Sequence, residues 1–219
     1  MSNNKITDFL SGLRIVEEVE SPINGKLVVK RDLTWGTYIE GGGLTQSGGV
    51  ASEVWETSLS KIRRGKVEIG NTLILGLGAG SIAKLVRKYW SDSKITGVDI
   101  DPVIVELGRK YFDLDKLDVE IVIADAYEQV NNGRWNLNSF DLICVDTYIG
   151  DSFPAKIESE PFIKGTRKLI NKEGVGVFNR LYYGEKRAEA EKFEKKLERI
   201  FGSVERVYPE ANVMFVCRK

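Results

Sequence analysis

The sequence predicts a doubly wound α/β fold with a mostly parallel, seven-stranded sheet, preceded by a small antiparallel β unit. Residues 72–80, TLILGLGAG, form an apolar strand that ends in a glycine loop and continues into a helical pattern. From there to the end of the chain, strands and helices alternate, which predicts ligands at the carboxyl ends of parallel strands. Ahead of this region, short extended pieces alternate with turn sequences.

The first part of the chain predicts the small β unit. Residues 12–40 contain three extended pieces separated by the turn sequences SPING and DLTWG. Residues 40–49 contain five glycines, so we expect no regular structure there, but a linker or a mobile wall of a site. Residues 50–64 have a helical pattern and lead to the glycine loop. The predicted domains are therefore a β unit with its glycine-rich loop over residues 1–49 and a nucleotide-binding α/β domain over residues 50–219.

The glycine loop indicates the class of ligand. Gly76, Gly78 and Gly80 alternate, so the backbone can turn tightly and approach a ligand closely. The helix that follows directs its free N–H groups and the positive end of its dipole to the same place. A dinucleotide loop, G-x-G-x-x-G, would have its third glycine at Ser81. The G-x-G-x-G spacing therefore favours a nucleotide of the S-adenosylmethionine type.

Three later strands end in aspartates at the same predicted edge of the sheet. The first ends in Asp99, with Asp101 two positions on, and a carboxylate there can accept hydrogen bonds from both ribose hydroxyls. The next ends in Asp125, which can accept from the exocyclic amine of adenine. The third ends in Asp146. Any one of them also suits the cap of a following helix, but together with the glycine loop they predict a nucleotide site.

The remaining elements complete the sheet. We expect helices at residues 81–90, 102–112, 126–131, 161–170 and 185–201, and a fifth strand at residues 174–181. The chain ends in two strands, SVERVYP and ANVMFVCRK, joined by the turn sequence PEAN. A terminal hairpin that places the seventh strand antiparallel is typical of methyltransferase-type sheets, and ordinary dinucleotide folds lack it.

Composition excludes several function classes. The 32 Lys and Arg residues balance 32 Asp and Glu residues, so no net charge favours nucleic acid or a membrane as a partner. The chain has no histidine, which removes the usual general base, the Ser-His and Cys-His nucleophiles and the commonest metal ligand, and we expect no metal. Cys144 and Cys217 fall within predicted strands and are expected to be buried structural thiols.

The sequence also predicts where the protein is found. The opening residues MSNNKITDFL lack the apolar core of a signal peptide, and no apolar run reaches the length of a membrane span. We therefore expect a soluble, cytoplasmic protein. The oligomeric state is not fixed by the sequence, and a homodimer is compatible with it.

From about residue 35 onward, the chain resembles the spermidine synthase family, the aminopropyltransferase branch of the class I methyltransferase fold. Ile74 stands two positions before the first glycine, where ordinary methyltransferases carry an acid and aminopropyltransferases do not. Gln46 and Trp55 resemble the family's glutamine and the aromatic residue that follows it at a helix start. The segment VDTYIGDSFP is similar to bacterial spermidine-synthase-like proteins, including those fused to transporter segments.

This resemblance implies roles for single residues. Gln46 and the glycine loop would bind the nucleotide, Asp99 the ribose, and Asp125 with Ala126 the adenine. Asp146 would be the catalytic aspartate, and with no histidine available we expect it to be the base, its pKa raised by burial against an apolar wall that includes Trp55 or Tyr148. The co-substrate would be decarboxylated S-adenosylmethionine or its intact form, and the acceptor a small amine.

The departures from the family pattern concern the transferred group and the acceptor. Ala79 replaces a loop aspartate that contacts the aminopropyl amine, so we expect no strong preference for the decarboxylated nucleotide. The Tyr-(His/Gln)-Glu triplet is Trp-Glu-Thr at residues 55–57, which removes a phenol. Tyr148 is the first candidate to replace it, with Tyr182 and Tyr183 as others.

A second acid that grips the far amine of the acceptor should fall at Ile149, and Asp151 is offset by two positions, so putrescine recognition is an open question. We therefore expect Trp55 and Asp151 near the acceptor. The leading hypothesis is a spermidine-synthase-like transferase with an unassigned amine acceptor. A class I methyltransferase, a nucleotide-binding homologue without transfer activity and, more distantly, an NAD-dependent dehydrogenase are the alternatives.

Overall fold

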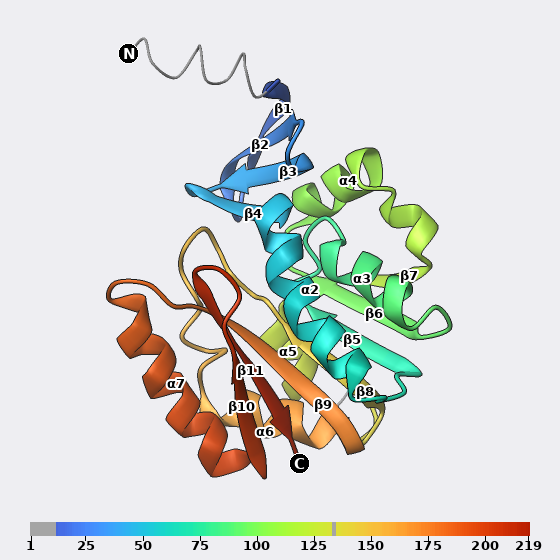
Figure 1. Ribbon diagram of the computed structural model, residues 1–219, viewed down its shortest axis with the longest axis vertical. Coiled ribbons are helices and arrows are strands. Elements are labelled where there is room, and N and C mark those ends of the chain that lie inside the picture. Colours follow the sequence, from blue (N-terminus) through green and yellow to red (C-terminus); the bar gives the residue numbers. More distant parts are fainter. Residues whose placement is uncertain (1–11, 133–134) are drawn as a thin grey trace.

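The computed structural model describes residues 12–132 and 135–219 and contains two sheets (Figure 1). The small sheet has the order β1 (Arg14–Ser21), β2 (Gly25–Asp32), β3 (Gly36–Gly41) and β4 (Leu44–Gly48), with all neighbours antiparallel. The predicted N-terminal β unit is thus confirmed. The opening residues MSNNKITDFL, on which the expectation of no signal peptide was based, lie outside the described residues.

The large sheet has seven strands in the order β10-β11-β9-β8-β5-β6-β7. Its strands are β5 (Asn71–Leu75), β6 (Lys94–Asp99), β7 (Val119–Ile123), β8 (Phe140–Val145), β9 (Ile170–Leu181), β10 (Ser203–Val207) and β11 (Asn212–Arg218). The first five are parallel to one another, whereas β11 runs antiparallel to β9 and β10. This arrangement confirms the predicted mostly parallel sheet with its C-terminal antiparallel hairpin.

Helices cover both faces of the large sheet (Figure 1). They are α2 (Gly49–Arg64), α3 (Ser81–Tyr89), α4 (Pro102–Tyr111), α5 (Ala126–Asn131), α6 (Glu160–Leu169) and α7 (Lys186–Ile200), with a short 3₁₀ turn, η1 (Leu114–Leu117). Apolar side chains of α2, α3 and α4 pack with one face of the sheet, and those of α5, α6 and α7 with the other. Neighbours such as Ile143 and Cys144 belong to opposite cores, because successive side chains in a strand point to opposite faces.

The expectation that residues 40–49 lack regular structure is wrong. Residues 36–41 and 44–48 pair as the antiparallel strands β3 and β4. Gly42 and Gly43 between them have φ angles of 59° and 80°, values that a tight hairpin turn requires and that glycine adopts without strain. The glycines therefore specify a hairpin here, although their number suggested an irregular segment. The same residues do form one wall of the cavity described below.

Polar contacts attach the small sheet to the large domain beside α3 and α4. The Ser21 hydroxyl donates to Asp101 Oδ2 at 2.5 Å, and Asp101 also caps α4 by accepting from Val103 N. The Ser47 Oγ atom accepts from the backbone N–H of Ala79 at 2.9 Å, within the glycine loop. The strand β4 is thereby fixed against the loop that follows β5, and the β1–β2 turn against the start of α4. In the described parts of the chain, no helix is long and apolar enough to cross a membrane.

Candidate active site

A cavity of about 410 Å³ lies at the carboxyl ends of the parallel strands, within the size range of small-molecule sites. Its walls come from the β1–β2 turn, β4, the first turns of α2, the glycine loop and the ends of β6, β7 and β8. The loop after β8 and the β10–β11 hairpin complete it. The position matches the rule that open α/β sheets bind ligands beyond the carboxyl ends of their strands.

The glycine loop is shaped by contacts within the protein. Gly76, Gly78 and Gly80 have φ angles of 91°, 55° and 94°, so the predicted tight turn is confirmed. A Cβ atom on Gly76 would lie 2.0 Å from the backbone oxygen of Asp146, and one on Gly78 would lie 2.7 Å from Ser47 Oγ. Gly76 and Gly78 line the cavity. Gly80 is not among the lining residues, and a Cβ atom on it would lie 2.7 Å from the Leu114 side chain.

Asp99 lies at the end of β6 and faces the cavity. Its Oδ2 atom accepts from the Gly78 N–H at 2.7 Å, and its Oδ1 atom accepts from the Asp101 N–H at 2.9 Å. Burial raises the pKa of Asp99 to about 6, and the two backbone N–H groups act in the opposite direction. Each oxygen keeps a further lone pair for a ligand. Asp101, in contrast, is fully buried beneath the β1–β2 turn and does not line the cavity.

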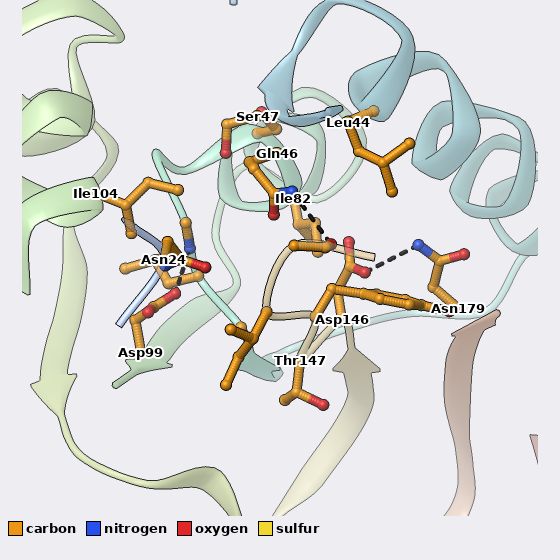
Figure 2. A pocket seen from close by; sticks show the side chains of 18 of the residues that line it. Asn24, Leu44, Gln46, Ser47, Ile82, Asp99, Ile104, Asp146, Thr147 and Asn179 are labelled. Carbon is orange, nitrogen blue, oxygen red and sulfur yellow. Dashed lines mark hydrogen bonds between the residues drawn. The ribbon is translucent and has the colours of Figure 1, made fainter. Parts of the chain in front are cut away.

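Asn24 is a cavity residue that the sequence analysis missed. It lies in the β1–β2 turn, and Figure 2 places its side chain close to Asp99. Its Nδ2 atom donates to Asp101 Oδ2 at 2.6 Å, while its Oδ1 atom is buried and has no hydrogen-bond partner among the described residues. A buried acceptor without a partner is costly, so it indicates a place for a ligand donor. The sequence SPING marked this asparagine only as a turn residue.

Asp146 follows β8 and receives two hydrogen bonds from distant parts of the chain. The Trp55 Nε1–H donates to Asp146 Oδ2 at 2.5 Å, and Asn179 Nδ2 donates to Oδ1 at 2.9 Å, as Figure 2 shows for Asn179. Asn179 Oδ1 in turn accepts from Asn212 Nδ2 at 2.8 Å. Burial raises the pKa of Asp146 to about 6, as predicted, whereas the indole N–H lowers it. Trp55 thus donates a hydrogen bond to the Asp146 carboxylate, in addition to forming part of the apolar wall.

Asp125 and Ala126 line the cavity at the end of β7. Asp125 Oδ1 caps α5 by accepting from Tyr127 N at 2.8 Å, and Oδ2 pairs with Lys156. The hydrogen bond from Lys156 lowers the pKa of Asp125, although its burial acts in the opposite direction. Asp125 therefore does cap a helix, which was the alternative interpretation of the strand-end aspartates. An adenine amine that bound to Asp125 would have to share the carboxylate oxygens with Lys156.

Gln46 and Tyr148 also line the cavity. Gln46 Nε2 donates to the backbone oxygens of Gly41 at 2.9 Å and Gly150 at 3.3 Å, which ties β4 to the loop after β8. The Tyr148 hydroxyl accepts from the Leu181 N–H at 2.8 Å, and burial raises its pKa. Tyr148 is therefore held against β9 and is unsuited to lose its proton at neutral pH.

Two further candidates lie outside the cavity lining. Asp151 has a side chain that is 61% exposed and lies 4.0 Å from Lys186. Tyr182 donates from its hydroxyl to Glu191, whereas Tyr183 does line the cavity. Ala79 is fully buried and does not line the cavity either. Asp151 therefore does not border the cavity in which we expect the acceptor. Ala79 does not border it either, so the side chain at that position has no direct contact with the expected place of the donor.

The cavity carries an excess of acidic groups. Its lining includes Asp99, Asp125, Asp146 and Glu210, and the one basic residue of the described lining is Lys156. In a concave site with low-dielectric walls, such an arrangement attracts cations. The described residues contain no group of three or more acids or cysteines placed to hold a metal ion.

We predict that Asp99→Ala weakens the binding of a nucleoside probe, 5′-methylthioadenosine, by about 2–4 kcal/mol, because it would remove the acceptor that the resemblance assigns to the ribose and would release the Gly78 N–H. Calorimetric titration measures the change. Asp92→Ala, which removes an exposed aspartate outside the cavity, is the control and should leave the affinity unchanged. Equal affinity of the wild-type and Asp99→Ala proteins would exclude Asp99 from the site.

Comparisons with known proteins point to one family. A family model, the spermine/spermidine synthase domain, matches residues 64–213. The polyamine aminopropyltransferase of Neisseria meningitidis serogroup A is 32% identical over 129 residues, which are 58% of this chain and 47% of that protein. The chain thus spans about half the length of this curated relative.

Solved structures show the same fold. The crystal structure of a probable spermidine synthase from Corynebacterium glutamicum aligns with a TM-score of 0.79 and 18% identity, covering 94% of this chain and 80% of that one. Human methyltransferase-like protein 13, solved in complex with SAH, aligns with a TM-score of 0.60 and 19% identity, covering 77% and 79%. At these identities the likeness establishes the fold alone.

Proposed function

This chain belongs to the spermine/spermidine synthase family, and from that premise we propose that it transfers an aminopropyl group from decarboxylated S-adenosylmethionine to a small amine. The observation that carries the proposal is Asp146, a cavity carboxylate fixed by Trp55 and Asn179 at the end of β8. It lies on the same sheet edge as Asp99 and the glycine loop. The groups that we assign to nucleoside binding and to proton transfer thus line one cavity.

We propose that the nucleoside lies between the glycine loop and the β1–β2 turn. Asp99 would accept from the ribose hydroxyls, and the unpartnered Asn24 Oδ1 would receive a donor from the same nucleoside. Asp125 and Ala126 would border the adenine ring. Gln46 would support this arrangement by holding β4 to the loop after β8. These groups fit a nucleoside, since they offer acceptors to its hydroxyl and amine donors.

The sulfonium donor supplies a carbon atom that is open to in-line displacement. The acceptor nitrogen forms a bond to that carbon, the carbon–sulfur bond breaks, and its electron pair stays on sulfur, which releases methylthioadenosine. The nitrogen must lose a proton, and we assign Asp146 as the group that takes it. Each Asp146 oxygen keeps a lone pair beyond its hydrogen bond to Trp55 or Asn179. Its pKa of about 6 lies closer to neutrality than that of an ordinary aspartate, as suits a base.

The cavity charges support a cationic donor. The four acids that face the cavity, opposed by Lys156, would repel the carboxylate of intact S-adenosylmethionine. The loop position that would contact the aminopropyl amine is the buried Ala79, so this preference would come from the field of the cavity and not from a direct ion pair. Because Ala79 carries no charge, the loop itself does not repel the carboxylate of intact S-adenosylmethionine. A class I methyltransferase is therefore the second candidate function.

Competition binding against 5′-methylthioadenosine tests the donor. We expect decarboxylated S-adenosylmethionine to bind about tenfold tighter than the intact nucleotide, a difference of about 1.4 kcal/mol, and NAD not to compete. Tighter binding of the intact nucleotide would contradict the proposal and favour the methyltransferase alternative. A preference above about 100-fold would contradict the expectation that the loss of the loop acid at Ala79 weakens this discrimination.

A further inference from the structure

We propose that Lys156 and Asp125 together contact the polar edge of the purine ring, so that this chain binds 6-oxopurine nucleosides nearly as tightly as adenine nucleosides. The inference rests on the proposed function and assigns to it a residue that determines base selectivity. Lys156 lies in the loop between β8 and α6, Asp125 follows β7, and both line the cavity. The resemblance to spermidine synthases assigns the adenine to Asp125 and Ala126 and gives Lys156 no role.

The Asp125 carboxylate faces the cavity with most of its acceptor capacity in use. Its Oδ1 atom accepts from the backbone N–H groups of Tyr127 at 2.8 Å and Glu128 at 3.3 Å, at the start of α5. Its Oδ2 atom accepts from the Lys156 ammonium. Burial acts to raise the pKa of Asp125, but the hydrogen bonds from Lys156 and the backbone outweigh it and lower this pKa, so the carboxylate is charged at neutral pH. A ligand therefore meets an acceptor and a cationic donor side by side.

The loop before α6 fixes the backbone of Lys156. The Lys156 oxygen accepts from the Ser159 hydroxyl at 2.6 Å, and Ser159 also caps α6. Ile157 is buried, and its N–H donates to the Pro154 oxygen at 2.9 Å. The Lys156 side chain is about half-exposed, and among the residues that the structure describes its ammonium pairs with Asp125 alone. Two of the three donors of the ammonium group thus remain for a ligand.

An acceptor beside a donor complements both kinds of purine. In adenine the exocyclic amine is a donor and N1 is an acceptor, whereas in a 6-oxopurine N1 carries a proton and the C6 oxygen is the acceptor. Asp125 would accept from the amine or from the N1–H, and Lys156 would donate to N1 or to the C6 oxygen. Without Lys156, the C6 oxygen would face a carboxylate with no donor beside it, which disfavours the 6-oxopurine.

The apolar walls beside this pair do not distinguish the two bases. Ile100 from the end of β6, and Pro154 and Ile157 from the loop before α6, line the cavity. Apolar side chains of this kind pack on the faces of any purine, because both bases have the same fused ring system. Base selectivity therefore depends on the polar pair of Asp125 and Lys156.

Calorimetric titration with 5′-methylthioadenosine and 5′-methylthioinosine tests the assignment without depending on turnover. The two probes differ only at N1 and C6 of the purine. We expect the wild-type protein to bind them with affinities within about fivefold of each other, and Lys156→Met to weaken binding of the inosine probe about tenfold. The adenosine probe should change by less than about threefold, because the loss of a donor to N1 is offset by the release of Asp125 from a competing donor.

Two further variants separate the donor from the loop that carries it. Lys164→Met is the matched control, because Lys164 is an exposed lysine of α6 that pairs with Glu160 outside the cavity, and it should bind both probes as the wild type does. Lys156→Arg keeps a cationic donor beside Asp125 and should retain binding of both probes. If the inosine probe is lost equally in Lys156→Met and Lys156→Arg, the proposal is overturned, since the donor would then not be the cause.

Two results with the wild type and Lys156→Met would also overturn the proposal. They are a wild-type preference for the adenosine probe above about fivefold, and a ratio of the two affinities that is the same in Lys156→Met as in the wild type. Failure of the wild-type protein to bind either nucleoside would overturn the proposed nucleoside site together with this inference. If both probes bind with the expected ratios and no amine is alkylated, base selection by Lys156 stands and the proposed transfer fails.

Discussion

Asp146→Asn should lower the rate of aminopropyl transfer by about 10²–10⁴ while the affinity for 5′-methylthioadenosine stays within about twofold of the wild type. The carboxylate is the only proposed proton acceptor at the reacting nitrogen, and an amide cannot take its proton. The carboxylate also accepts hydrogen bonds from Trp55 and Asn179, so an amide NH₂ would face one of these donors. The side-chain shape is otherwise kept. Single-turnover kinetics with saturating donor, together with calorimetry, separates the chemical step from binding.

Asp92→Asn is the matched control for this substitution. It makes the same chemical change at an exposed aspartate outside the cavity and should leave both rate and affinity unchanged. An Asp146→Asn protein with near wild-type transfer would show that Asp146 serves only to fix Trp55 and Asn179. Parallel loss of nucleoside affinity would place Asp146 in the nucleoside site.

Gly76→Ala should destabilise the folded protein by about 3 kcal/mol or more. The new Cβ atom would lie 2.0 Å from the backbone oxygen of Asp146, and the residue would keep a φ angle of 91° that alanine rarely adopts. Relief of the clash would require the backbone after β5 to move away from that after β8, which carries the proposed base. Urea unfolding measures the loss of stability.

Gly36→Ala is the control that measures the cost of a positive φ angle alone, without a steric clash. Gly36 is the first residue of β3, directly after the β2–β3 turn, with a φ of 68°, and nothing lies within 4 Å of the place that a Cβ atom would take there. This control should lose about 1 kcal/mol. A Gly76→Ala protein that loses no more than Gly36→Ala would show that the glycine loop and Asp146 are not packed as closely as described.

The fold of the large domain was predictable because the sequence patterns that indicate its strands, helices and turns each lie within a short stretch of the chain. The apolar strands at residues 71–75 and 140–145, the alternation with helices, and the PEAN turn all depend on neighbours in sequence. An aspartate at the end of a parallel strand must lie at the same edge as other strand ends, so the cavity positions of Asp99 and Asp146 also followed from the order of elements.

The rest of the site depends on contacts between distant residues. The hydrogen bond from Trp55 to Asp146 joins α2 to the end of β8, and the position of Asn24 beside Asp99 depends on how the small sheet docks. Neither follows from local periodicity. The hairpin at residues 40–49 was missed for a different reason, since glycines at positive φ specify a tight turn as readily as an irregular segment.

Product analysis of the purified protein tests the central claim most directly. The protein is incubated with decarboxylated S-adenosylmethionine and 1,4-diaminobutane, and the products are identified by mass spectrometry. The account predicts equal amounts of methylthioadenosine and aminopropylated diamine, formed by the wild-type protein and strongly reduced in Asp146→Asn. Methylated amine formed from intact S-adenosylmethionine, or donor binding without any transfer to a panel of amines, would contradict it.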